Sequence, residues 1–206
     1  EAVERTTFAE EPEILSELRL LAETTETDDG VATASESARR LFRNLKSEGI
    51  THPKVVAFAS QSANARALWL SLSDTVEGCE VLLFAGDEAE RDATSITRFK
   101  APRTAAVLIC DESGEEGLNL ACADAIVHLD LPMSAARIEQ RIGRLDRFGR
   151  RKGRVRHRIV LPVDEEDSPW TGWFEFLAHG LAIFHRSISD IQFLLDGFER
   201  QLFRGL

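Results

Sequence analysis

The sequence lacks the features of a membrane protein and of a zinc-binding or disulfide-stabilised protein. No apolar run reaches the roughly 18 residues that a membrane-spanning helix needs, and no signal peptide is visible. The three cysteines (Cys79, Cys110 and Cys122) show no CxxC spacing and the five histidines are dispersed, so we expect no metal site. An odd, unclustered set of cysteines is typical of a reducing compartment. We therefore expect a cytoplasmic protein without a membrane partner.

A second absence concerns the binding of nucleoside triphosphates. The sequence contains no G-x-x-x-x-G-K-[ST] phosphate loop and no acidic DExx strand that would hold magnesium. These parts cradle the phosphates of the nucleotide and bind its metal ion in P-loop enzymes. The chain by itself is therefore not expected to hydrolyse ATP.

Charge, in contrast, is abundant and unevenly distributed. The 206 residues carry a formal net charge of -10, yet residues 137–158 contain ten Lys or Arg and only two acids, Glu139 and Asp146. Guanidinium groups are planar, permanently charged and suited to bidentate phosphate contacts. The cluster indicates a surface for a nucleoside triphosphate or a nucleic-acid backbone. The alternative is a set of surface arginines that pair with acids elsewhere in the chain.

Short apolar segments alternate with helical segments along the middle of the chain. Strands are expected at residues 54–60, 80–86, 105–111, 125–132 and 155–162. Helices are expected between them at residues 36–50, 63–74, 87–100 and 134–148. Strands that are apolar on both faces and alternate with helices indicate a parallel sheet covered on two sides. In such sheets ligands bind beyond the carboxyl ends of the strands.

The two ends of the chain depart from this alternation. Residues 12–23 have the apolar spacing of a helix, and residues 24–35 are polar and rich in Gly, Thr and Ser, which predicts a mobile loop. We expect Ser35 or Ser37 to cap the next helix and Gly49 to end it. The tail from Pro169 has the pattern of two further helices.

Two segments at the predicted ligand-binding edge carry the chemistry. The stretch "CDESGEEGLNL" at residues 110–120 follows a strand, and Gly114 and Gly117 allow a sharp turn and close approach of a ligand. By itself, however, the stretch is a weak signal that favours a plain strand-to-helix loop. In the helix predicted at residues 134–148, Gln140, Arg144 and Arg147 fall on one face.

These segments together resemble a known family. "QRIGRLDR" matches the Q-R-x-G-R-x-x-R pattern that closes the second RecA-like lobe of superfamily 2 helicases and translocases. "SGEEGLNLACADAIVHLDLP", "KVVAFAS" and "FAGDEAERDATSITRFK" resemble other segments of that lobe, especially in its SNF2 and RapA-like branch. The resemblance covers roughly residues 36–163. It implies an α/β, RecA-like three-layer fold with a mostly parallel sheet and a C-terminal helical extension. The domains expected from it are residues 1–30, 31–165 and 166–206.

The resemblance also implies roles for individual residues. In the family, two arginines of the closing motif reach the γ-phosphate of ATP, where a fixed guanidinium stabilises charge on the transferred phosphoryl group; these catalytic candidates are Arg144 and Arg147. Residues expected to orient the motif or approach the nucleotide are Gln140, Arg141, Gly117 and Asn119. Residues expected to contact nucleic acid are Ser60, Gln61, Gly114, Arg150 and Arg151. SNF2-type proteins commonly continue "RIGQ" where this chain reads "RFGRRKG", so Arg150 and Arg151 either contact a DNA backbone or only solubilise the turn.

The function that the resemblance implies is that of the second motor lobe of an ATP-dependent DNA helicase or translocase. ATP and Mg²⁺ would be held mainly by the first RecA-like lobe of the same protein. The other expected partner is DNA, with RNA as the alternative, and the expected location is the bacterial nucleoid. Because the chain begins at Glu1 and carries half of an ATP site, we expect a piece of a longer protein. A stand-alone adaptor that binds nucleic acid or protein through its basic helix is the alternative.

Overall fold

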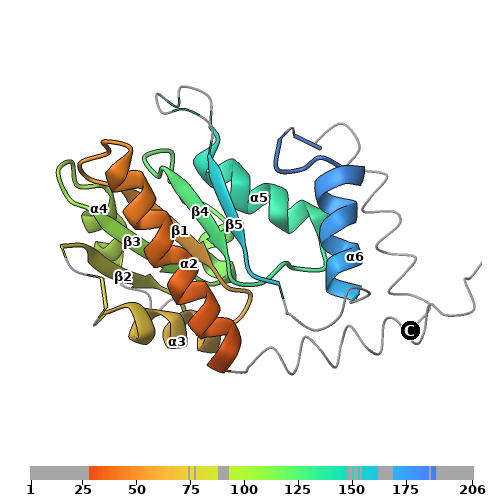
Figure 1. Ribbon diagram of the computed structural model, residues 1–206, viewed down its shortest axis with the longest axis horizontal. Coiled ribbons are helices and arrows are strands. Elements are labelled where there is room, and N and C mark those ends of the chain that lie inside the picture. Colours follow the sequence, from red (N-terminus) through yellow and green to blue (C-terminus); the bar gives the residue numbers. More distant parts are fainter. Residues whose placement is uncertain are drawn as a thin grey trace, which may run out of the picture.

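A sheet of five parallel strands forms the centre of the fold. The computed structural model describes residues 28–73, 75–76, 78–87, 93–147, 150, 153, 155–161, 169–185 and 187–188. The strands are β1 (Lys54–Phe58), β2 (Glu80–Phe84), β3 (Ala106–Cys110), β4 (Ala125–His128) and β5 (Arg156–Ile159). They lie in the order β2-β3-β1-β4-β5, and each neighbouring pair is parallel. The predicted α/β fold with a parallel sheet is confirmed (Figure 1).

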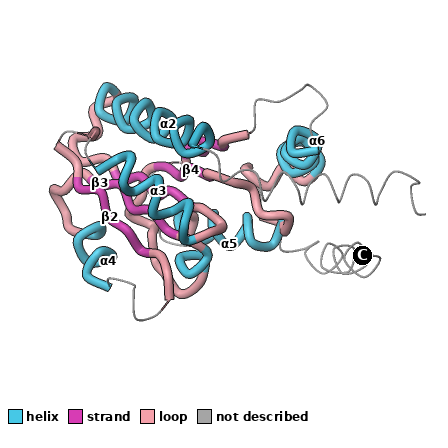
Figure 2. Tube along the Cα trace, turned by 90° about the horizontal axis from the view of Figure 1, so that it is seen from below, coloured by secondary structure: helices cyan, strands magenta, loops and turns pink. Residues whose placement is uncertain are grey.

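Helices cover both faces of this sheet, as expected because the central strands β1, β3 and β4 are buried throughout. The helices of the lobe are α2 (Asp28–Ser47), α3 (Ser62–Ser73), α4 (Ala93–Lys100) and α5 (Ala135–Leu145), with a 3₁₀ turn η1 (Glu112–Glu115) after β3. One apolar cluster joins the sheet to α2 and α3, and a second joins the opposite face to Phe99 of α4 and Leu145 of α5. Figure 2 shows α2 on one side of the strands and α4 on the other.

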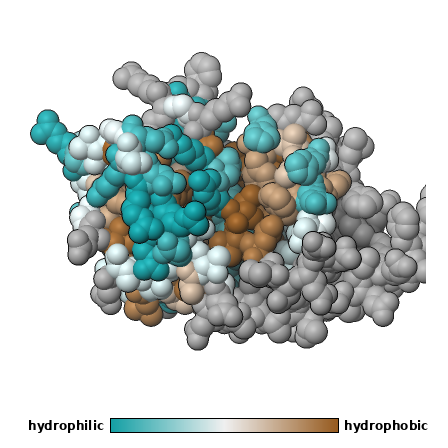
Figure 3. Space-filling model, in the orientation of Figure 1, coloured by the Kyte–Doolittle hydropathy of each residue, from teal (hydrophilic) through white to brown (hydrophobic). Residues whose placement is uncertain are grey.

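The predicted loop at residues 24–35 is wrong for its described part, because α2 already begins at Asp28. Ala34 and Ala38 lie one turn apart on its buried face, and the same face continues through Leu41 and Leu45. Ser35 therefore does not cap a helix; it is buried inside α2 and its hydroxyl donates to Ser71 Oγ at 2.7 Å. The outward face of α2 is hydrophilic (Figure 3). Packing of the buried face stabilises a helix that Gly, Thr and Ser by themselves do not favour.

Other predicted boundaries differ by smaller amounts. Gly49 adopts φ +89° just after α2, so the prediction that it ends this helix is confirmed. The strands end up to four residues earlier than predicted. The helix predicted to reach residue 148 ends at Leu145, because Asp146 leaves helical geometry (φ -90°, ψ 84°) while its N–H bonds to Ile142 O. Arg147 consequently lies beyond the helix, not on its face.

A C-terminal segment packs against the outer side of α5. It contains α6 (Pro169–Glu175) and a π-helical turn η2 (Phe176–Gly180). Its buried residues Leu177, Leu181 and Ile183 form one apolar cluster with α5. Glu139 of α5 accepts hydrogen bonds from Ile188 N (2.9 Å) and from the Ser187 hydroxyl. The predicted helix at residues 12–23 and most of the second tail helix lie outside the described residues, and the domain limits at residues 30 and 165 stay predictions.

Candidate functional site

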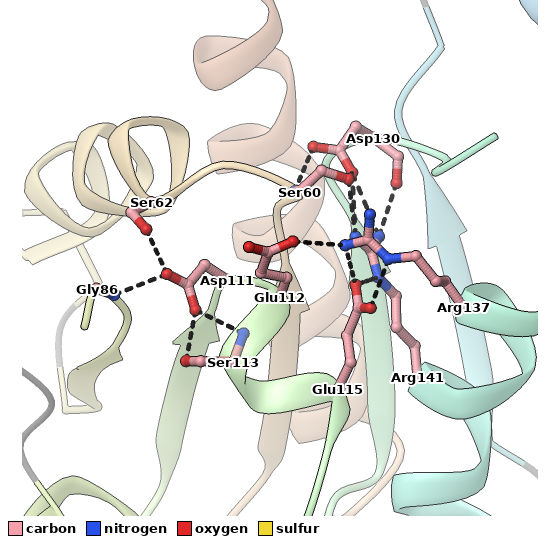
Figure 4. A network of polar contacts seen from close by, with 10 residues as sticks. All are labelled: Ser60, Ser62, Gly86, Asp111, Glu112, Ser113, Glu115, Asp130, Arg137 and Arg141. Atoms are coloured by element: carbon pink, nitrogen blue, oxygen red, sulfur yellow. Dashed lines mark hydrogen bonds and ion pairs between the residues drawn. The ribbon is translucent and has the colours of Figure 1, made fainter. Parts of the chain in front are cut away.

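The carboxyl ends of β1, β3 and β4 place three polar residues at one edge of the sheet. Ser60, Asp111 and Asp130 each follow shortly after one of these strands. Because the strands are parallel, their carboxyl ends meet at the same edge. Two further elements border this edge (Figure 4). Helix α5 contributes Arg137 and Arg141, and turn η1 contributes Glu112 and Glu115. The result is two linked polar networks, one centred on Arg141 and one on Asp111.

Arg141 is the centre of the first network and is completely buried. Its Nε donates to Glu115 Oε1 at 2.7 Å, its Nη1 to the Asp130 carbonyl at 2.9 Å, and its Nη2 to Ser60 Oγ at 3.0 Å. Asp130 Oδ1 lies 3.2 Å from Nη2, and the guanidinium sits over the Phe58 ring, 5.5 Å from its centroid. All three guanidinium nitrogens are therefore used inside the lobe. Arg141 joins β1, β4, η1 and α5.

Glu115 serves two arginines at once. Besides binding Arg141, its carboxylate accepts from Arg137 Nε at 2.7 Å and from Arg137 Nη2 at 2.9 Å, a bidentate pair. These hydrogen bonds raise the pKa of the Arg137 guanidinium above its ordinary value, against the opposite effect of its burial. Glu112 adds a longer ion pair of 3.5 Å to Arg137 Nη2. For Arg137 and Arg141, the alternative that acids elsewhere in the chain neutralise the arginine cluster is therefore correct.

Asp111 is the centre of the second network and fastens β2 and α3 to the end of β3. Its carboxylate accepts from Gly86 N at 2.7 Å, from Ser113 N at 2.9 Å, from Ser113 Oγ at 2.6 Å, and from the Ser62 hydroxyl. Burial by itself raises the pKa of this carboxyl, but the hydrogen bonds outweigh burial and the pKa lies below its ordinary value. Asp111 is thus a fixed carboxylate that holds the loop of residues 111–116 in place.

The two predicted arginine fingers are not part of these networks. The Arg144 side chain makes no ion pair with a described residue, and its Nε is buried without a hydrogen-bond partner among them. Arg147 Nη2 donates to the Leu118 carbonyl at 3.1 Å and its Nε lies 3.4 Å from the Gly143 carbonyl, so its described partners are neutral. Gln140 is exposed on α5. Both arginines thus keep a positive charge that no described carboxylate neutralises.

The glycine-rich loop lies next to these arginines. Leu120 N donates to the Arg144 carbonyl at 2.9 Å. Gly117 has φ +72° with open space around the position of a Cβ atom, and Asn119 is exposed, with its side-chain oxygen accepting from Ala121 N at 3.2 Å. Their predicted approach to a nucleotide stays a prediction, but both lie where a ligand has access.

The residues predicted to contact nucleic acid differ in their surroundings. Ser60 donates both its N–H and its hydroxyl to Asp130, each at 2.6 Å, while Gln61 next to it is exposed. Gly114 is buried, and a Cβ atom there would lie 2.6 Å from Cys110 Cβ, so the residue is small because of internal packing. Among the described residues, the partners of the Arg150 side chain are the backbone carbonyls of Ala121, Leu145 and Gly153. Arg151 lies outside the described residues, and all these nucleic-acid roles stay predictions.

Sequence reasoning missed the acids that organise the site. Glu115, Asp111 and Asp130 accept most of its hydrogen bonds, yet the sequence motifs that predict the site are marked by arginines and glycines. A usable signal exists for two of the three, since Asp111 and Asp130 follow buried parallel strands and therefore belong to the ligand-binding edge. No such rule identifies Glu115, which depends on the geometry of η1.

Metal-binding clusters and membrane-spanning helices are two further features to consider among the described residues. Within the part of the chain that the structure describes, no group of three or more His, Cys, Asp or Glu side chains is placed to hold a metal ion. Among the same residues, no helix combines the length and the apolar character needed to cross a bilayer.

Comparison with known proteins identifies relatives of the lobe. Residues 37–149 match the helicase conserved C-terminal domain family. RNA polymerase-associated protein RapA of Vibrio cholerae serotype O1 (strain M66-2) is 37% identical over 151 residues, which are 72% of this chain and 15% of RapA. RapA of Vibrio campbellii is 38% identical over 124 residues, covering 59% of this chain and 13% of the relative. The chain thus spans a small part of the length of these curated relatives.

Solved structures agree on the fold. The Sulfolobus solfataricus SWI2/SNF2 ATPase core in complex with double-stranded DNA superposes with a TM-score of 0.58 at 18% identity, over 91% of this chain and 40% of that one. The C-terminal domain of the DEAD-box protein Dbp5 superposes with a TM-score of 0.53 at 20% identity, over 73% of this chain and 79% of that one. The match over more than half of its length shows that the chain belongs to the helicase conserved C-terminal domain family.

Proposed function

We propose that this chain is the second motor lobe of an ATP-dependent DNA translocase or helicase. A first RecA-like lobe of the same protein holds ATP and Mg²⁺, and this lobe supplies Arg144 and Arg147 to the phosphates. Opening and closing of the two lobes during hydrolysis then moves the protein along DNA. The chain alone turns over no ATP, because its sequence contains no phosphate loop.

One observation carries this proposal: the arginines of residues 137–147 fall into two groups. Arg137 and Arg141 are neutralised by Glu115 and Asp130, whereas Arg144 and Arg147 have no carboxylate partner among the described residues. Two guanidinium groups that no described acid neutralises are suited to an anion supplied from outside the lobe. The phosphates of ATP on a facing lobe supply it, and they gain most in the transition state, where negative charge spreads over the transferred group.

The neutralised arginines have a supporting role in this proposal. Arg141 is buried and all its nitrogens are occupied, so it positions α5 and does not touch the nucleotide. Gly117 and Asn119 approach the ribose from the neighbouring loop, and the exposed Gln140 completes the nucleotide-facing side. Among the predicted nucleic-acid residues that the structure describes, Gln61 is exposed and so accessible to a nucleic-acid backbone.

The proposal that the protein moves along DNA is supported by a structural neighbour and not by contacts of this chain. The Sulfolobus neighbour was determined in complex with double-stranded DNA, and the curated relatives are named for association with RNA polymerase. Both descriptions fit a protein of the bacterial nucleoid. An RNA track remains the alternative, and binding of matched DNA and RNA duplexes to the full-length protein distinguishes the two.

The decisive experiment measures ATP turnover of the full-length protein with single arginine variants. Arg147→Ala should lower kcat on the order of 10³-fold, the range that arginine fingers contribute. Its circular dichroism and melting temperature should stay close to wild type, because its described bonds go only to the Leu118 and Gly143 carbonyls.

Arg98→Ala is the matched control for loss of one arginine. Arg98 lies on α4 and pairs with the exposed Glu80 at the start of β2, at the opposite edge of the sheet. Its replacement should leave kcat within about twofold, because an exposed ion pair contributes little. Normal turnover in Arg147→Ala together with weakened DNA binding would reject the finger role and make the basic segment a DNA site.

A further inference from the structure

The Arg150 side chain binds three backbone carbonyls that come from three different segments. Its Nη1 donates to Ala121 O at 3.0 Å and to Leu145 O at 3.2 Å, and its Nε donates to Gly153 O at 3.0 Å. The residue is half-buried, and desolvation lowers the pKa of its guanidinium in spite of the nearby charges of Asp124 and Asp146. A phosphate-binding arginine is expected to extend into solvent, and this one is directed into the lobe.

The three carbonyls lie at the end of α5, in the loop after the glycine-rich turn, and before β5. Leu145 is the last residue of α5, where helix carbonyls lack intrahelical partners. A cationic donor at this end also interacts favourably with the helix dipole. Ala121 belongs to the loop that follows the glycine-rich turn, and Gly153 lies on the approach to β5. Arg150 thus joins the end of the arginine helix to the loop beside it.

The Arg150 contacts extend a series of bonds between the same two segments. Leu120 N donates to the Arg144 carbonyl at 2.9 Å, and Arg147 Nη2 donates to the Leu118 carbonyl at 3.1 Å. Arg150 adds the bond to Ala121, and its own N–H donates to the Arg147 carbonyl at 2.9 Å. Leu118, Leu120 and Ala121 are therefore each bonded to the segment that contains Arg144, Arg147 and Arg150.

We propose that Arg150 is a positioning residue that fixes the loop of residues 117–122 against the end of α5. In this role it holds the loop that carries Gly117 and Asn119 in a fixed position relative to Arg144 and Arg147. The functional half of this inference rests on the proposed function, since it assumes that Arg144 and Arg147 act on ATP. The structural half does not, and it is tested separately.

Lysine at position 150 separates positioning from phosphate binding. A lysine keeps the positive charge and would still bind a DNA phosphate, but its single nitrogen cannot reproduce three bonds from a planar guanidinium. Positioning therefore predicts that Arg150→Lys behaves like Arg150→Ala. Phosphate binding predicts that Arg150→Lys behaves like the wild type.

The structural half is tested by amide hydrogen exchange on the chain itself. The Leu120 and Asp146 amides, which donate to Arg144 O and Ile142 O, should exchange at least about tenfold faster in both Arg150 variants. The Val56 amide in the central strand should be unchanged and reports that the fold is intact. Unchanged exchange at Leu120 and Asp146, or full protection restored by lysine, would overturn the inference.

The functional half is tested by steady-state kinetics of the full-length protein. Both variants should lower kcat about tenfold, the loss expected for about one net hydrogen bond, with the KM for ATP and the salt dependence of DNA binding unchanged. If Arg150→Ala instead reduces the salt slope by about one while lysine restores it, Arg150 is a DNA contact and the inference is wrong. Normal kcat in Arg150→Ala with a strong defect in Arg147→Ala overturns the positioning role alone, whereas normal kcat in Arg147→Ala overturns the proposed function.

Discussion

Replacing Glu115 by alanine tests the network that holds the arginine helix in place. The carboxylate is 3% exposed and binds Arg141, which is completely buried, and Arg137, whose side chain is 33% exposed. The substitution removes every contact of Arg141 Nε and leaves this guanidinium with Asp130 and Ser60. The main cost in stability arises because the buried Arg141 guanidinium loses one of its two carboxylate partners.

The magnitude follows from these contacts. Removing one partner of a buried ion pair costs about 3–5 kcal/mol, and the remaining Asp130 contact places Glu115→Ala near the lower end, at about 3 kcal/mol. The half-exposed Arg137 pair adds only about 0.5 kcal/mol, because solvent screens it. For a chain of this size the total corresponds to a decrease in melting temperature of roughly 7–14 °C. Glu115→Gln keeps an acceptor oxygen and should lose about half as much.

Urea unfolding of three variants is the appropriate assay. Glu116→Ala is the matched control, because Glu116 is the adjacent residue, carries the same charge and is exposed; its free energy of unfolding should stay within about 0.5 kcal/mol of wild type. Equal stabilities of Glu115→Ala and Glu116→Ala would refute the reasoning, since net charge and not a buried contact would then explain both.

Two other predictions concern glycines and histidines. Gly114→Ala should destabilise by about 1–3 kcal/mol, because its Cβ would meet Cys110 Cβ at 2.6 Å. A Cβ atom at Gly143 would meet nothing within 4 Å, so Gly143→Ala should stabilise α5 by about 1 kcal/mol. Changes in the free energy of unfolding of the same sign for both variants, measured in urea, would contradict this. Burial lowers the pKa of His128 far below 6.5, helped by Arg141 and His157, and burial together with His185 lowers that of His157 to about 4. The folded state thus favours the neutral forms of both histidines. Their contribution to the free energy of unfolding is therefore fully present above about pH 6.5 and decreases as the pH falls toward 4. Between pH 7.5 and 5.5 the free energy of unfolding should fall by about 1.4 kcal/mol per histidine, and His157→Phe should remove about half of this decrease; a flat wild-type profile would contradict the assignment.

The sequence was sufficient to predict the sheet because its signals are local and strong. The five apolar runs and the helices between them dictate a parallel sheet, and a buried strand such as β1 has few alternative structures. Boundaries were harder to predict where packing decides. Helix α2 extends through Gly30 and Thr33 because Ala34 and Ala38 face the core. Helix α5 ends at Leu145, before the predicted residue 148, because Asp146 leaves helical geometry.

The site was predictable only in part, because its acids and arginines meet through the fold. The sequence placed Arg144 and Arg147 in one motif but could not show that Glu115, 26 residues before Arg141, occupies the space beside that arginine. Nor does composition reveal that Arg150 points inward. Long-range pairs of this kind depend on where β3, β4 and α5 end relative to one another, and local patterns do not encode these distances.

The central claim is that Arg147 stabilises charge on the phosphoryl group of ATP held by a partner lobe. Its most direct test compares the affinities of the full-length protein and its Arg147→Ala variant for ADP and for ADP–aluminium fluoride, which mimics the transferred phosphoryl group. An arginine that acts in the transition state predicts that the affinity for the analogue falls on the order of 10²-fold or more, while the affinity for ADP changes little. Unchanged affinity for the analogue, or an equal loss for both ligands, would contradict the account.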